Sequence, residues 1–174
     1  MGGRAVGKRV FDPPLAYAEI DRVYSFTTHV LRALGMPQWR LQVMTKPCRR
    51  TSYADITPGE MKHVGELRLA PAWMAMDVEA ERIPTLVHEC LHLTHAELTH
   101  LWSDEMCGKY LGTRGVIELG PLWERAIEMW VDQQTQVMLA LLPWEDWAEE
   151  VWGPEAAAQG LESWRDLGST QDHG

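Results

Sequence analysis

The sequence is poor in cysteine, in phenylalanine and in long apolar runs. Its 174 residues include only three cysteines and two phenylalanines, and no apolar stretch approaches the roughly 18 residues that a membrane span requires. Cys48, Cys90 and Cys107 are odd in number and form no CxxC pair, which argues against a disulfide framework and favours a reducing, cytoplasmic compartment. The first residues lack the apolar run of a signal peptide. We therefore expect neither export nor a membrane anchor.

Basic clusters are scarce as well. The chain has 16 Lys and Arg against 25 Asp and Glu, for a net charge of −9. Apart from Lys46, Arg49 and Arg50, no group of basic residues stands among aromatics, so the sequence predicts no nucleic-acid binding. Residues 145–172 hold eight acids against one base. Most of the negative charge therefore lies near the C-terminus, and the body of the chain is close to neutral.

What the sequence does contain is enough apolar surface for one packed domain. Apolar residues make up 45% of the chain and include nine tryptophans, and this length accommodates one core rather than two. Residues 1–14 are Gly-rich and end in Asp-Pro-Pro, which predicts a flexible arm. Residues 15–152 form the expected domain, and 153–174 are predicted to be an acidic, disordered tail.

Hydrophobic periodicity predicts an α+β fold. Helical spacing occurs over 15–34, 77–99 and 122–142, and a Trp-rich helical turn is expected over 144–152. Period-two alternation predicts strands over 39–44 and 64–69, and a further short strand is expected over 52–56. We expect a small antiparallel or mixed three-stranded sheet packed on the middle helix. Residues 102–121 are predicted to be a long loop, because glycine and proline interrupt them repeatedly. These residues are Gly108, Gly112, Gly115, Gly120 and Pro121.

The motif that carries chemistry is His-Glu-Cys-Leu-His at residues 88–92, an HExxH pattern within the middle helix. Histidines four residues apart on a helix share one face, so His88 and His92 can both reach one Zn²⁺ ion. Glu89 would lie beside the metal and act as the general base towards a water that the metal activates. A chance match of so short a pattern is the alternative.

A catalytic zinc site needs a third protein ligand. The later helix carries Glu124, Glu128 and Asp132, spaced by four, with no Lys or Arg at i+4 to balance them. An acidic stripe is ordinarily a solvated helix face. Here the pattern also indicates a carboxylate ligand, Glu128 or alternatively Glu124.

With these motifs the sequence resembles small zinc metallopeptidases of the gluzincin type, most closely the ImmA/IrrE-like and phage-encoded minimal metallopeptidases. The resemblance spans about residues 20 to 143. It implies a minimal zincin-like domain in which Glu128 completes the metal shell and Asp132 hydrogen-bonds a ligand histidine. It also implies a peptide or protein substrate that pairs with an edge strand, expected at 65–69.

Several alternatives remain open at the level of sequence. One alternative is a zinc-binding but non-catalytic interaction module, for example one encoded by a phage, and another is a metal-free helical protein. His95 is expected either beside the metal ligands or on the surface. The oligomeric state is not encoded in these patterns. The candidate oxyanion stabilisers are Tyr53, His63, His100, Tyr110 and Arg114.

Overall fold

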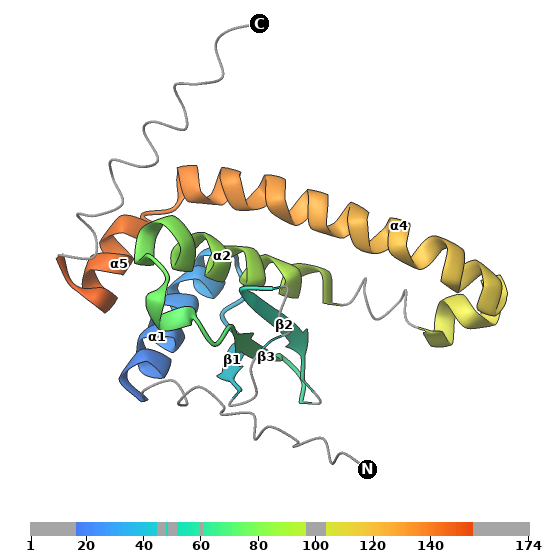
Figure 1. The fold of residues 1–174 in the computed structure, drawn as a ribbon, viewed down its shortest axis with the longest axis horizontal. Helices are drawn as coiled ribbons and strands as arrows, with labels where there is room; N and C mark the ends of the chain where they lie inside the picture. Colours follow the sequence, from blue (N-terminus) through green and yellow to red (C-terminus); the bar gives the residue numbers. More distant parts are fainter. Residues whose placement is uncertain (1–16, 45–47, 49–51, 60, 97–103, 155–174) are drawn as a thin grey trace, which may run out of the picture.

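Four α-helices and a three-stranded mixed sheet make up the described part of the chain, which is therefore α+β as expected (Figure 1). The computed structural model describes residues 17–44, 48, 52–59, 61–96 and 104–154. The predicted arm, 1–14, and nearly all of the predicted tail lie outside these residues. None of the described helices is both long enough and apolar enough to cross a bilayer.

The first helix, α1 (Tyr17–Ala33), confirms the predicted helix over 15–34. Val23, Phe26 and Val30 recur at helical spacing and are fully buried, because they form the stripe that α1 presents to the core. Two residues beyond the helix end, Gly35 turns the chain with a φ of 74°, a left-handed conformation that glycine adopts without strain.

Three strands form the sheet: β1 (Arg40–Val43), β2 (Ala54–Pro58) and β3 (Val64–Leu69). Their order is β1-β3-β2, with β1 parallel and β2 antiparallel to β3. All three predicted strands are confirmed, but the expectation that 65–69 is an edge strand is wrong. Since β3 pairs on both sides, its backbone groups are already used, and the strand that borders α2 is β2.

The helix with the HExxH motif, α2 (Ile83–His92), is shorter than the predicted 77–99. A π-helical turn (Val78–Arg82) precedes it and a 3₁₀ turn (Leu93–His95) follows. Asp77 caps this entry, since its Oδ1 accepts the Ala80 N–H at 2.7 Å. The apolar side chains just before and within the motif are buried against α1 and the sheet: Leu86, Val87, Cys90 and Leu91.

The long helix α4 (Asp104–Leu141) corrects the predicted loop over 102–121, because its described residues, 104–121, are helical. Two helical segments meet at Gly112, whose φ of 67° produces the kink. Each glycine in a helix costs only about 1 kcal/mol, and local contacts such as the 2.8 Å Arg114–Glu118 ion pair offset part of that cost. The C-terminal half of α4 packs along α2, while its N-terminal half extends beyond the sheet (Figure 1).

The last helix, α5 (Trp144–Trp152), packs against α1 and confirms the Trp-rich helical turn. Phe26 contacts the rings of Trp147 and Trp152, with centroids 6.4 and 5.3 Å away. Trp144 packs on the same core and donates its indole N–H to the Leu139 carbonyl at 2.7 Å. These tryptophans therefore cover the core rather than forming a separate exposed surface.

Candidate metal centre

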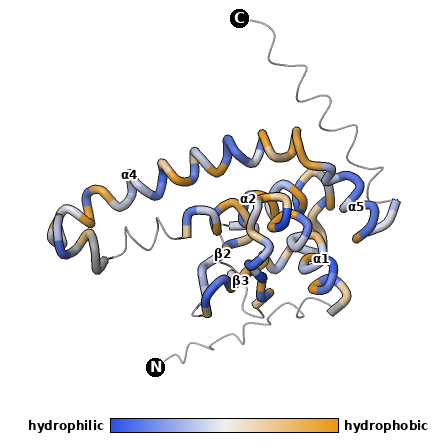
Figure 2. Tube along the Cα trace, turned by 180° about the vertical axis from the view of Figure 1, so that it is seen from behind, coloured by the Kyte–Doolittle hydropathy of each residue, from blue (hydrophilic) through white to orange (hydrophobic). Residues whose placement is uncertain are grey.

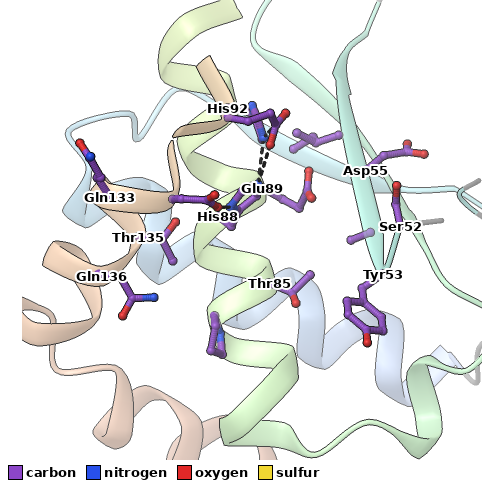
Figure 3. A pocket seen from close by; sticks show the side chains of 15 residues that line it. Ser52, Tyr53, Asp55, Thr85, His88, Glu89, His92, Gln133, Thr135 and Gln136 are labelled. Atoms are coloured by element: carbon purple, nitrogen blue, oxygen red, sulfur yellow. Dashed lines mark hydrogen bonds and ion pairs between the residues drawn. The ribbon is translucent and has the colours of Figure 1, made fainter. Parts of the chain in front are cut away.

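The two motif histidines lie one turn apart on the same face of α2 (Figure 3). The Nε2 atoms of His88 and His92 are 3.1 Å apart, and both side chains are about one-fifth exposed. At this distance the two nitrogens either share one proton in a hydrogen bond or turn both lone pairs towards a common cation.

Glu128 reaches this pair from α4. Its Oε2 lies 3.5 Å from His88 Nε2 and its Oε1 lies 3.5 Å from His92 Nε2. Zinc bonds of about 2.0–2.1 Å in tetrahedral arrangement place neighbouring donor atoms about 3.3 Å apart. The observed distances are similar, but the two to Glu128 involve different oxygens, and one donor atom from each residue lies within 4.8 Å of the others. The two imidazoles and the carboxylate also match the His₂Glu donor set of catalytic zinc sites. The residues present therefore fit a zinc ion.

Asp132 and Glu124 flank Glu128 on α4 but differ in position. Asp132 Oδ1 lies 3.2 Å from His88 Nδ1, the ring nitrogen opposite the one that faces Glu128. Glu124 is exposed and belongs neither to the cluster of potential ligands nor to the lining of the adjacent pocket. The structure thus brings Glu128 and Asp132, and not Glu124, to the histidines.

His92 has the electrostatic setting of a neutral ligand. Burial, and then the neighbouring His88, lower the pKa of His92 from 6.5 to about 4. Its imidazole is consequently uncharged at neutral pH, and a lone pair is available for a metal.

Glu89 lies next to the cluster in a buried position, with a relative exposure of 7%. Burial, followed by the negative charges of Glu128 and Asp55, raises the pKa of Glu89 from 4.5 to about 8, while a hydrogen bond from the Ile56 backbone N–H opposes this rise. In the absence of a cation, this carboxyl group holds a proton at neutral pH. The Ile56 N–H fixes the carboxyl group between α2 and β2.

An open pocket of about 820 Å³ exposes the cluster to solvent (Figure 3). One wall is the motif face of α2, a second is the segment 52–56 at β2, and a third is the part of α4 from 128 to 136. No Lys or Arg is among the described residues of its lining. The pocket wall on α4 is instead rich in neutral polar groups: Gln133, Thr135 and Gln136.

The remaining candidates are placed away from the cluster, with one exception. Tyr53 lines the pocket and is 64% exposed. His63 lies in the β2–β3 turn, where its ring contacts Trp39. Tyr110 and Arg114 are exposed on the projecting part of α4, and His100 is outside the described residues. His95 packs edge-on against Trp130 at 4.1 Å and does not line the pocket. Cys90, within the motif, is completely buried and is a small core residue rather than a ligand.

The sequence analysis missed the contribution of β2 to the site. Asp55 and Ile56 act on Glu89 across the gap between strand and helix, yet they were assigned only to a short strand. The short strand expected over 52–56 was the available signal, but the sequence does not give the strand order that puts this segment beside α2.

Comparisons of the chain with protein-family models, with curated proteins and with solved structures found no match.

Proposed function

We propose that this protein is a zinc-dependent peptidase of minimal zincin-like architecture, with His88, His92 and Glu128 as its metal ligands. The observation that carries the proposal is the convergence of these three donor groups beside the buried Glu89, at the mouth of an open pocket. A zinc ion held there supplies Lewis-acid chemistry, polarising a carbonyl group and lowering the pKa of water to about 7.

Glu89 is proposed as the general base and acid. Its carboxylate takes a proton from the attacking water and returns that proton to the amine that leaves when the peptide bond breaks. The hydrogen bond from Ile56 holds the carboxyl group in place during both transfers. A group whose pKa is shifted towards neutrality suits this double role, because it can both accept and release a proton near pH 7.

The substrate is proposed to bind along β2 as an extended peptide. The Tyr53 carbonyl accepts the Ala70 N–H at 2.7 Å, and the Gly59 N–H donates to the Val64 carbonyl at 2.7 Å. In an antiparallel pair, alternate residues turn their backbone groups the other way. Ala54 and Ile56 therefore direct their backbone groups to the open edge, on the pocket side, where the Ile56 N–H is already bonded to Glu89. The Ala54 N–H and carbonyl and the Ile56 carbonyl remain to pair with a substrate strand. Backbone pairing at this edge favours binding of peptides with little dependence on sequence.

Replacing the base without disturbing the ligands tests this function. Glu89→Gln should keep its zinc and lose cleavage of a fluorescently labelled unfolded protein such as casein by at least about 100-fold, since the amide cannot accept the proton. Glu124→Gln is the matched control, an acid-to-amide change outside the cluster, and should cleave at the wild-type rate. Cleavage by Glu89→Gln at the wild-type rate would refute the assignment of the base. A wild-type protein that holds zinc and cleaves no peptide would instead favour a non-catalytic zinc-binding module.

A further inference from the structure

The outer face of α4 is apolar, although it faces away from the core. Hydrophobic positions recur along this helix in Figure 2. Six large apolar side chains between residues 119 and 141 are 38 to 72% exposed. We call them the outer stripe: Leu119, Leu122, Met129, Trp130, Val137 and Leu141.

The outer stripe is a continuous face of the helix. At 100° per residue, its six members fall within a sector of about 120°, opposite the buried Val131. Ala126 and Ala140 lie in the same sector and are exposed. From residue 119 to 141 the charged positions all lie outside this sector: Glu124, Arg125, Glu128 and Asp132.

A surface helix of a monomer ordinarily has one apolar stripe, which faces the core. In α4 that inner stripe is present too, and it includes Ile127, Val131, Met138 and Leu139. The outer stripe is therefore a second apolar face, and it stays exposed in the described part of the chain although His95 packs edge-on against Trp130. Its six side chains expose on the order of 100 Å² each, about 600 Å² in total, and patches of this size mark interaction sites.

We propose that the outer stripe binds the same face of a second copy of this chain, so that two α4 helices pair in a symmetric dimer. Such a pair would bury about 1,200 Å² in all, which reaches the range of specific interfaces. Symmetric, self-complementary contacts are the commonest form of protein association. The inference does not use the metal ligands, because Leu122 and Met129 do not line the pocket, although the exposed Gln133 in the same sector does.

Charge permits a second copy and disfavours a membrane. The net charge of −9 makes two copies repel each other, but most of that charge lies in residues 145–172 and the outer stripe itself carries none. A membrane surface is attracted by Lys and Arg along the polar border of a helix. In α4 the residues 119–141 contain only Arg125 as a base, against Glu124, Glu128 and Asp132.

Sedimentation equilibrium on the full chain tests the dimer. The wild type should be dimeric at about 100 µM, a concentration that allows for the weak association of an interface at the small end of the specific range. Met129→Glu and Leu122→Glu should each raise the dissociation constant at least tenfold, because the dimer would bury an unpaired carboxylate. Met61→Glu is the matched control: Met61 is 66% exposed, as Met129 is 54% exposed, but lies in the β2–β3 turn.

Three outcomes overturn the proposal. They are a wild-type protein that stays monomeric at this concentration, a dimer that survives both stripe variants, and a dimer that Met61→Glu weakens equally. Circular dichroism melting curves and zinc content of the variants should match those of the wild type, which separates loss of the contact from loss of the fold. Because zinc content is measured on the same samples, failure of the dimer is distinguishable from failure of the metal centre.

Discussion

Asp132 determines which nitrogen of His88 faces the cluster. Its Oδ1 lies 3.2 Å from Nδ1, while Nε2 of the same ring faces Glu128 at 3.5 Å. A carboxylate at one ring nitrogen keeps the proton there, so that the other nitrogen retains its lone pair.

We therefore expect Asp132→Ala to weaken zinc binding by about 10- to 100-fold. The fold should persist, because the Asp132 side chain is 71% exposed. Competition against a chromogenic zinc chelator measures the change. Glu124→Ala removes an acid from the same helix outside the cluster and serves as the control. Equal weakening in both variants would mean that only the general negative charge of α4 matters.

For individual site residues, the sequence predicts only those contacts that depend on local spacing. His88 and His92 meet because four residues make about one helical turn, which the motif alone specifies. Choosing between Glu124 and Glu128 requires knowing how α4 crosses α2, and that follows from tertiary packing. The contact between Glu89 and the Ile56 N–H was inaccessible for the same reason, since a backbone donor leaves no trace in the sequence.

At the scale of elements, a buried ion pair joins the start of the fold to the motif helix. Glu19 of α1 and Arg82, just before α2, are 2.8 Å apart and almost completely buried. The same Glu19 oxygen accepts the indole N–H of Trp73 at 3.1 Å. The Glu19–Arg82 ion pair thus fixes the N-terminal end of α2 against α1.

Glu19→Ala should lower the free energy of unfolding by about 3–5 kcal/mol, because it leaves the buried Arg82 without this carboxylate. Urea unfolding followed by circular dichroism measures the loss. Asp21→Ala, a change at an exposed position of the same helix, should cost less than about 0.5 kcal/mol. If the two variants were equally stable, the pair would contribute nothing to the fold.

The elements themselves were predicted unevenly. Helices α1 and α5 and all three strands carry clear periodicity, and their positions were predicted to within a few residues. The helical segment 104–121 was mistaken for a loop, because glycine density was weighed above the helix-forming residues between the glycines. The edge strand was misplaced because strand order is a property of chain topology: β3 is last in sequence yet central in the sheet.

At the scale of the whole molecule, the stability of the metal-free protein should depend on pH through Glu89 and His92. The raised pKa of Glu89, about 8, makes the folded chain bind more protons than the unfolded chain between pH 4.5 and 8, so this group lowers stability as the pH rises. The lowered pKa of His92, about 4, has the opposite effect up to pH 6.5. Only above pH 6.5 is the effect of Glu89 unopposed.

We expect the metal-free chain to lose roughly 1.5 kcal/mol of stability between pH 6.5 and pH 8. Urea unfolding in the presence of a chelator at the two pH values measures this loss. Glu89→Gln, which cannot titrate, should abolish it. A loss of the same size in that variant would show that other groups are responsible.

The most direct test of the central claim is the zinc content and zinc affinity of the purified protein and its ligand variants. The account predicts about one zinc per chain in the wild type and in Glu124→Ala, and almost none in His88→Ala. Glu128→Ala should bind zinc at least about 100-fold more weakly than the wild type. A wild-type protein without affinity for zinc, or a Glu128→Ala variant that binds it as tightly as Glu124→Ala does, would contradict the account.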